Sequence, residues 1–151
     1  MKLKILILPV IATLSTSSGH SQNTNEDISN MLNAFVYDLN NLNLDSFIDN
    51  FATNATVFYP RNTFPIERVN GKEEIKKEFK IFFDNVRKSK EGPPFLNIIP
   101  TERIINVYDG VAIVSLHFKL GEEFHRRTIV LENNNNKWLI IHLHASFLID
   151  N

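Results

Sequence analysis

Most of the side chains that could do chemistry lie in the last three strand-like segments of the chain. Histidine, arginine and threonine alternate there with apolar residues, and a strand places alternate residues on one face of a sheet. The candidate binding residues in these segments are His117, Arg126, Thr128 and His142. Arginine forms charge-assisted hydrogen bonds with acidic or carbonyl oxygens, and histidine exchanges protons near neutral pH. These residue types predict a site that binds a small molecule with a polar end.

The turns of this region predict which of these residues face each other. A four-residue loop at Asn133–Asn136 would set the last hairpin, giving the pairs Glu132–Lys137, Arg127–His142 and His125–His144. Closure of the hairpin before it gives the pairs Lys119–Phe124 and His117–Arg126. A shift of one residue would move every side chain to the other face.

Helices are predicted in the first half of the chain and strands in the second. Apolar residues recur at helical spacing after Thr24 and after Lys72, and a short helix follows Asn43 or Asp45. Strands are predicted at residues 56–59, 95–107, 111–120, 124–132 and 137–148, with Asn54 ending the second helix and a hairpin turn at Asp109-Gly110. This order predicts an α+β fold with the helices on one face of a curved antiparallel sheet.

The amino terminus has the composition of a secretory signal. Lys2 and Lys4 precede an apolar run from Ile5 to Leu14, and small polar residues follow. The run has about half the length of a membrane span. We therefore predict a signal peptide at residues 1–21, cleavage before Gln22, one domain at 22–151 and a periplasmic or secreted protein without a membrane anchor.

The overall composition excludes several classes of function. The formal net charge of -1 argues against a nucleic-acid partner, because such proteins present a basic surface. The sequence has no cysteine, which excludes disulfides, thiol catalysis and a lipid-anchoring cysteine. The 151 residues fit one globular domain.

Three stretches resemble the nuclear transport factor 2-like superfamily. They are "LNLDSFIDNFATNATVFYP", "VNGKEEIKKEF" and "RRTIVLENNNNKWLIIHLHAS". The third is similar to the closing hairpin of SnoaL-like proteins and of the calcium/calmodulin-dependent kinase association domain. The resemblance implies a cone in which a strongly bent sheet wraps around its helices, with a pocket at the open end and often a second subunit on the convex face. The superfamily contains enzymes, adaptors and oligomerisation hubs, so membership alone does not define a function.

The resemblance also bears on two tyrosines. Tyr37 falls where ketosteroid isomerases of this superfamily have the tyrosine of their oxyanion hole. The place of their general base, a carboxylate just before a proline, is taken by Tyr59 ahead of Pro60. A phenol with a pKa of about 10 is a poor base at pH 7. Tyr37 and Tyr59 are therefore predicted as hydroxyl donors to a ligand, and Tyr37 alternatively as a helix residue at the edge of the core.

Within such a cone, either face of the last strands could line the pocket. In the first alternative the pocket is apolar with Arg126, Thr128 and His117 as its polar groups, and Arg127, His142 and His144 lie on a convex dimer face. In the second alternative the histidines line the pocket. Three imidazoles, those of His125, His142 and His144, could in principle bind zinc. Since no carboxylate accompanies them on the inward positions of these strands, we predict no metal and no cofactor.

Three functions remain open from these residues. The first is an exported protein that binds a small, partly apolar molecule without catalysis, with Arg126 contacting an acidic or carbonyl group. The second is an interaction module that forms a homodimer through its sheet. The third is an acid–base enzyme of the isomerase or hydrolase type with His117 or His142 as proton carrier.

Overall fold

The structure, a computed structural model, describes residues 18–59 and 68–147, with side chains from residue 23 onward. The predicted signal peptide lies outside the described residues except for 18–21, whose backbone belongs to the first helix. Signal peptide and export therefore stay predictions. No helix within the described ranges is long and apolar enough to cross a membrane.

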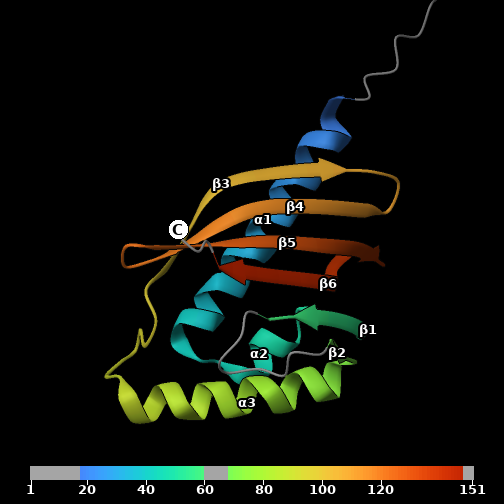
Figure 1. The fold of residues 1–151 in the computed structure, drawn as a ribbon. Coiled ribbons are helices and arrows are strands. Elements are labelled where there is room, and N and C mark those ends of the chain that lie inside the picture. Colours follow the sequence, from blue (N-terminus) through green and yellow to red (C-terminus); the bar gives the residue numbers. More distant parts are fainter. Residues whose placement is uncertain (1–17, 60–67, 148–151) are drawn as a thin grey trace, which may run out of the picture.

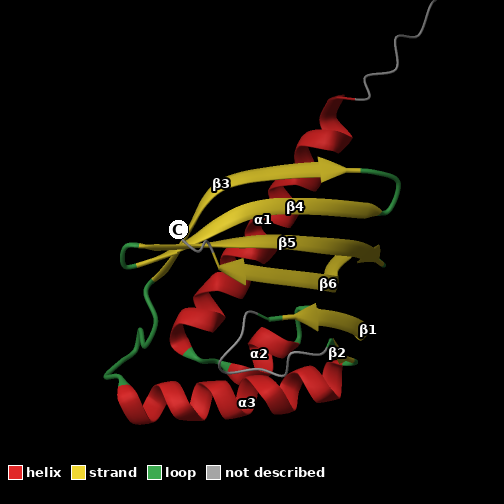
Figure 2. Ribbon diagram, viewed as in Figure 1, coloured by secondary structure: helices red, strands yellow, loops and turns green. Residues whose placement is uncertain are grey.

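Three helices and six strands make up the described chain (Figures 1 and 2). The helices are α1 (Ser18–Asn41), α2 (Leu44–Ile48) and α3 (Lys72–Ser89). The strands are β1 (Phe51–Phe58), β2 (Val69–Asn70), β3 (Ile98–Val107), β4 (Val111–Leu120), β5 (Glu123–Asn134) and β6 (Lys137–Phe147). The helices mostly precede the strands, which confirms the predicted α+β class.

The strands form one curled sheet in the order β2-β1-β6-β5-β4-β3. α1 crosses one face of this sheet, and α3 lies along its β1–β2 end (Figure 1). All neighbouring strands are antiparallel except β1 and β6, which are parallel. This parallel pair was not predicted from the sequence, because it joins strands that are far apart in the chain. It brings the end of β1 beside the end of β6.

β1 is longer than the sequence pattern indicated. It begins at Phe51, and Asn54, which was predicted to end the preceding helix, lies inside the strand. The register of β1 against β6 shifts between Phe51 and Thr56, so Asn54 lies at an irregular part of the strand. α3 follows its prediction closely. It buries Ile75, Phe79, Phe83 and Val86 on one side, as expected for an amphipathic helix.

A cluster of phenylalanines joins the helices to the sheet. The ring of Phe47 in α2 lies at its centre, with centroids 4.8 Å from Phe35 and 4.5 Å from Phe79. The rings of Phe51 and Phe83 complete the cluster, each with its centroid 5.5 Å from that of Phe47. Tilted and stacked rings at these distances add attraction beyond the burial of their surface. The cluster fixes the positions of Phe35 and Phe79, which also line the cavity described below.

The β5–β6 hairpin differs from its prediction at the turn. Asn135 and Asn136 have φ values of 52° and 65°, and the strands pair up to Asn134–Lys137. The loop therefore has two residues in the left-handed region, a conformation that asparagine tolerates well. The predicted four-residue loop and its pairing of Glu132 with Lys137 are wrong.

A bulge changes the register further along the same hairpin. The ladder shifts between Val130 and Leu131, whose partners in β6 are His142 and Ile140. Ile141 is the extra residue, and an extra residue reverses the alternation of faces. Beyond the bulge the pairs are Thr128–His144, Arg127–Ala145 and His125–Phe147, so the predicted pairs Arg127–His142 and His125–His144 are wrong. The preceding hairpin has the predicted pairs Lys119–Phe124 and His117–Arg126.

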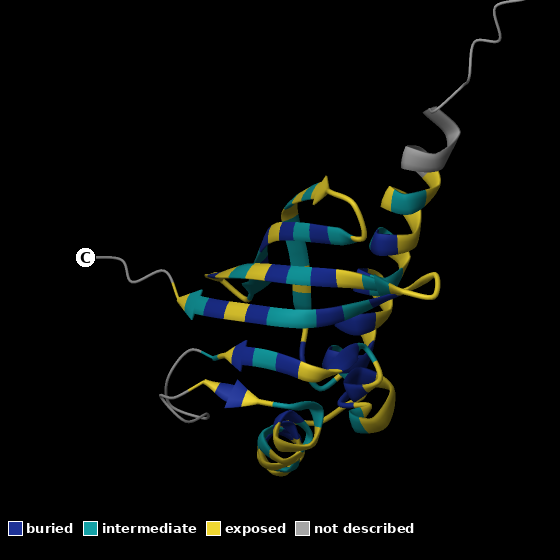
Figure 3. Ribbon diagram, turned by 90° about the vertical axis from the view of Figure 1, so that its right-hand side faces the viewer, coloured by how far each residue is buried: buried dark blue, intermediate teal, exposed yellow. Residues whose placement is uncertain are grey.

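The burial of the strands follows this corrected register (Figure 3). On β5 the buried residues His125, Ile129 and Leu131 share a face. On β6 Trp138 and Ile140 are buried before the bulge, and Leu143 and Ala145 after it. Leu139 and Leu143 therefore do not share the inward face, although their spacing in the sequence is even, because the bulge at Ile141 lies between them.

The start of β3 is attached to the end of α1 by one side chain. The Asn40 amide donates to the Ile98 carbonyl at 3.0 Å, and the Ile98 N–H donates to Asn40 Oδ1 at 2.9 Å. The Asn40 carbonyl also accepts from the N–H groups of Phe95 and Leu96. Asn40 thus substitutes for a neighbouring strand at this edge of the sheet and positions Leu96 and Ile98 beside the cavity.

Candidate functional site: a cavity inside the curled sheet

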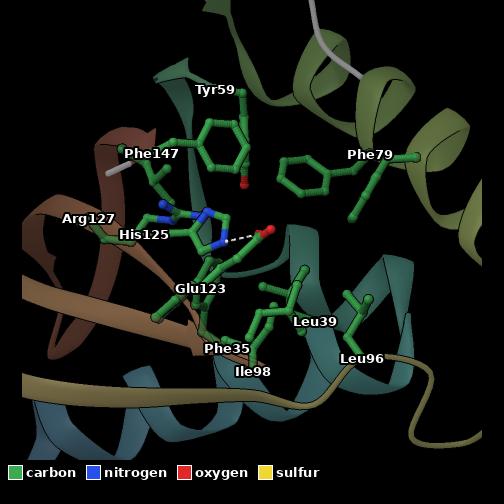
Figure 4. A pocket seen from close by; sticks show the side chains of 14 residues that line it. Phe35, Leu39, Tyr59, Phe79, Leu96, Ile98, Glu123, His125, Arg127 and Phe147 are labelled. Carbon is green, nitrogen blue, oxygen red and sulfur yellow. Dashed lines mark ion pairs between the residues drawn. The ribbon is translucent and has the colours of Figure 1, made fainter. Parts of the chain in front are cut away.

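A cavity of about 230 Å³ lies between the concave face of the sheet and the helices. Its walls come from α1, α3 and the strands β4, β5 and β6, together with the residues at the start of β3 (Figure 4). Most of the lining is apolar, including Phe35, Leu39, Phe79, Phe118, Leu143 and Phe147. A concave, largely apolar space with few polar groups is typical of small-molecule binding sites.

Four polar side chains line this cavity. They are Tyr59, Glu123, His125 and Arg127. The last three occupy alternate positions on β5, so the strand itself presents them on one face. Figure 4 shows the three side chains gathered on one side of the cavity, with the Tyr59 hydroxyl pointing toward them from the end of β1.

His125 is buried, with 7% of its surface exposed. Neither of its ring nitrogens has a hydrogen-bond partner among the described residues. Its Nε2 atom lies 3.4 Å from Glu123 Oε2, close enough for an ion pair but without hydrogen-bond geometry. Burial lowers the pKa of His125, the charge of Arg127 lowers it further, and Glu123 opposes both. The imidazole is therefore neutral at pH 7 and can accept a proton.

Arg127 is a partly buried cation without an acidic partner. No carboxylate of the described residues forms an ion pair with it, and its Nη1 donates only to the carbonyl of Arg126, at 2.8 Å. Its guanidinium lies over the ring of Phe118. Burial lowers the pKa of Arg127 to about 10, with Tyr59 opposing the shift. A desolvated charge that has no counter-ion costs stability, and an anion entering the cavity would remove that cost.

Tyr59 faces these groups from the other side of the cavity. Its ring packs edge-on against Phe79, with centroids 4.9 Å apart. Burial raises the pKa of Tyr59 well above its ordinary value, although Arg127 opposes the shift. The phenol therefore stays protonated at neutral pH and acts through its hydroxyl.

Of the six residues predicted for the site, only Tyr59 lines the cavity. His117, Arg126 and Thr128 lie on the opposite face of the sheet, where His117 pairs with Arg126. Their predicted position among the polar groups of the pocket is wrong, because it depended on the register of the last hairpin. The neighbours His125 and Arg127 occupy the cavity instead. The sequence of β5 itself indicates this face, since the apolar Ile129 and Leu131 occupy alternate positions with His125 and Arg127 and so share a face with them.

Tyr37 and His142 also lie outside the cavity lining. Tyr37 is 64% exposed on α1. His142 lies on the outer face of the sheet, where its Nδ1 is 2.7 Å from Thr56 Oγ1. Burial lowers the pKa of His142, with smaller contributions from His144 and Arg68. His142 and His144 both pack against Phe58, at 6.0 Å between ring centroids.

The three histidines that were weighed as zinc ligands do not come together. His125 faces the cavity, whereas His142 and His144 lie on the outer face. Within the described ranges, no three or more histidine or acidic side chains are grouped closely enough to hold a metal ion.

The curled sheet around its helices and the cavity at its concave face define the nuclear transport factor 2-like class of fold. Residues 28–150 match the family model described as the SnoaL-like domain, and the chain belongs to this family. No curated protein matches the sequence.

Solved structures support the same fold. A protein from Streptomyces avermitilis, described as a proposed dehydratase of the NTF2-like family, superposes with a TM-score of 0.71 at 14% identity, over 86% of this chain and 99% of that one. An NTF2-like protein of unknown function from Pseudomonas putida gives 0.69 at 14% identity, over 85% and 89%. A proposed ketosteroid isomerase from Parabacteroides distasonis gives 0.55 at 19% identity, over 70% and 75%. At these identities the likeness concerns the fold alone.

Proposed function

We propose that the protein binds a small, largely apolar molecule through a carboxylate or similar acidic oxygen that Arg127 holds in the cavity. The observation that carries this proposal is the guanidinium of Arg127, which faces an apolar cavity without a carboxylate partner among the described residues. Arginine can bind a carboxylate through two parallel hydrogen bonds, and such bonds are strongest where water is excluded. We therefore assign to Arg127 the contact with an acidic group that was predicted from the sequence for Arg126.

The size and lining of the cavity limit the ligand further. A volume of about 230 Å³ is below the range of about 300–1,000 Å³ typical of pockets for drug-sized molecules. The aromatic walls formed by Phe35, Phe79 and Phe118 favour a flat apolar body. A single ring with a short acidic chain meets both conditions.

A thermal-shift experiment with charged and neutral versions of one ligand tests this function. Benzoate and benzoylformate should raise the melting temperature of the wild-type protein, whereas neutral benzamide should not. A ligand at about 100 times its Kd stabilises by about 2.7 kcal/mol. Arg127→Ala should abolish the response. Arg126→Ala, the adjacent arginine on the opposite face, is the matched control and should respond as the wild type does. An unchanged response in Arg127→Ala would refute the proposal.

We also propose that the outer face of the sheet forms a homodimer. Phe58 is 40% exposed there and packs against His142 and His144. An exposed ring within a partly apolar face is the kind of surface that a second subunit covers. His144→Glu should convert a dimer to a monomer in light scattering, with His144→Gln as the matched neutral control. A wild-type monomer, or a dimer that survives both changes, would contradict this proposal.

We also propose that the protein is exported. The predicted signal peptide at residues 1–21 would direct the mature protein to the periplasm or to the medium. Amino-terminal sequencing of the protein from its own host should begin near Gln22. A mature protein that begins at Met1 would contradict export.

A further inference from the structure

His125 has no structural role that would explain its burial. Its surface is 7% exposed, and neither ring nitrogen has a hydrogen-bond partner in the described chain. A buried polar group without a partner costs about 1–3 kcal/mol. An apolar residue would fill the same place against Phe147, whose ring lies 4.6 Å away. The imidazole is therefore available to a molecule in the cavity.

The position of His125 relative to Arg127 restricts what such a molecule can be. The two residues are separated by one residue on β5 and line the same cavity. Strand geometry places alternate residues about 7 Å apart along the strand, with both side chains on one face. An anion held by Arg127 therefore presents the atoms next to its acidic group to the imidazole of His125.

We infer that the cavity also catalyses proton transfer, in which His125 removes a proton from the carbon beside the keto group of a 2-oxo acid bound by Arg127. This inference rests on the proposed function, because the acid must first bind at Arg127. The guanidinium has five N–H donors, of which one on Nη1 is used by the Arg126 carbonyl, and the others are enough to hold the carboxylate and the adjacent keto oxygen together. The 2-oxo acid would carry an aromatic or similar apolar group against the phenylalanine walls.

The step balances without any further reactant. The C3–H bond breaks, and its proton goes to the unprotonated ring nitrogen of His125. The electron pair forms the C2–C3 double bond, and the former keto oxygen carries the negative charge beside Arg127. Return of a proton to C3 regenerates the keto acid, and protonation of the oxygen gives its enol. A preformed positive group at the developing charge is an effective way to lower such a barrier.

The groups that face His125 suit this role. Glu123 lies 3.4 Å from Nε2 and can stabilise the imidazolium that forms. Arg127 and burial oppose the charge, which keeps the pKa of His125 below its ordinary value, so that it is unprotonated at neutral pH. Tyr59 faces the pair from the end of β1, and the surrounding residues of α1 and α3 that line the cavity are apolar.

Exchange of a carbon-bound proton with deuterated water tests the inference. The probe is phenylpyruvate, whose C3 protons are followed by NMR in the presence and absence of protein. Wild-type protein should accelerate the loss of this signal at least tenfold over buffer. His125→Asn and His125→Gln should reduce it to the buffer rate, while Arg126→Ala should keep it. Exchange by the wild type at the buffer rate would overturn the inference.

Benzoylformate separates this inference from the proposed function, because it has the same acidic end but no C3 proton. If benzoylformate binds the wild type and phenylpyruvate exchange stays at the buffer rate, only the proton transfer fails. If neither acid binds, both proposals fail. Loss of benzoylformate binding in a folded His125→Gln variant would assign His125 to binding and overturn its role as base.

A second variant keeps the test independent of the folding of the His125 variants. Glu123 is exposed, with 75% of its side-chain surface accessible, so Glu123→Gln should not affect folding. Glu123 raises the pKa of His125, and its removal should move the midpoint of the pH–rate profile to lower pH while benzoylformate still binds. A midpoint that does not move would contradict the assignment of His125 as the base.

Discussion

The guanidinium of Arg127 lies 5.0 Å from the centre of the Phe118 ring, which belongs to the neighbouring strand β4. A cation over an aromatic face gains about 0.5–2 kcal/mol, depending on how far it is desolvated. This contact holds the arginine in place without using its N–H groups. Nη1 donates to the Arg126 carbonyl, and no carboxylate in the described chain competes for the other N–H groups, which are therefore available to a ligand in the cavity.

Replacement of Arg127 by a residue of similar shape without charge should stabilise the ligand-free protein. Arg127→Met removes a desolvated cation and keeps the packing against Phe118, so we expect the free energy of unfolding to rise by about 1 kcal/mol. Urea unfolding measures this change. Arg126→Met, on the exposed face, should stay within about 0.5 kcal/mol of the wild type. A loss of stability in Arg127→Met that exceeds the loss in Arg126→Met would show that the charge is already compensated.

The stability of the protein should decrease in mild acid. The pKa values of His125 and His142 are lowered in the folded state, mainly by burial, from an ordinary value of 6.5. Above pH 6.5 both imidazoles are neutral in the folded and unfolded chains, so this contribution to stability is fully present. As the pH falls below 6.5 and through the folded pKa, the unfolded chain binds protons first and stability is lost.

Urea unfolding at pH 7.5 and pH 5.0 measures this pH dependence. The loss in free energy of unfolding between pH 7.5 and pH 5.0 should be smaller in His125→Gln than in the wild type. It should be smaller again when His142→Gln is added. The measured range of pH 5.0 to 7.5 lies above the range in which Asp45 and Asp84 titrate, since a lysine lowers the pKa of each from 3.8. An undiminished difference in the double variant would assign the acid sensitivity to other groups.

Asn40 should contribute more to stability than its neighbour Asn41. Asn40→Ala removes the two hydrogen bonds between its side chain and the backbone of Ile98. Leaving partly buried backbone groups without partners costs about 1–3 kcal/mol. Asn41→Ala removes only an exposed bond to the Tyr37 carbonyl and should cost less than about 0.5 kcal/mol. Equal losses in the two variants would contradict the role given to Asn40 at the edge of β3.

The turn of the last hairpin offers a stabilising substitution. Asn136 has a φ of 65°, a conformation that glycine adopts without steric cost. An Asn-Gly pair is also the preferred sequence of this two-residue turn. We expect Asn136→Gly to stabilise the protein by about 0.5 kcal/mol and Asn136→Ala to destabilise it by about 1 kcal/mol. Thermal melting gives the order of stability of the two variants and the wild type. An alanine variant more stable than the glycine variant would argue against a left-handed conformation at Asn136.

The same turn shows where sequence reasoning succeeded and where it failed. Gly121 marks a single short reversal, and the pairing of Lys119 with Phe124 followed from it. Four consecutive asparagines left the position of the next reversal undefined, because each of them tolerates a turn equally well. The bulge at Ile141 then added a second shift that no local pattern indicates. The turn shift of two residues leaves each side chain on its face, whereas the one-residue bulge reverses the alternation. The bulge therefore accounts for a predicted site on the opposite face from His125 and Arg127.

Features that depend on local pattern were predicted more accurately. β4 has the predicted ends, Val111 and Leu120, because turns at Asp109-Gly110 and Gly121 bound an uninterrupted apolar alternation. α3 begins at the predicted Lys72 for a similar reason. The parallel pairing of β1 with β6 and the meeting of Tyr59 with β5 depend on contacts between distant segments, which neither propensity nor periodicity encodes.

Isothermal titration with benzoylformate measures whether Arg127 holds the acidic group of a cavity ligand. We expect saturable one-to-one binding to the wild type and to Arg126→Ala, with at least tenfold weaker binding to Arg127→Ala. Equal affinity of Arg127→Ala and the wild type, or weaker binding only in Arg126→Ala, would contradict it.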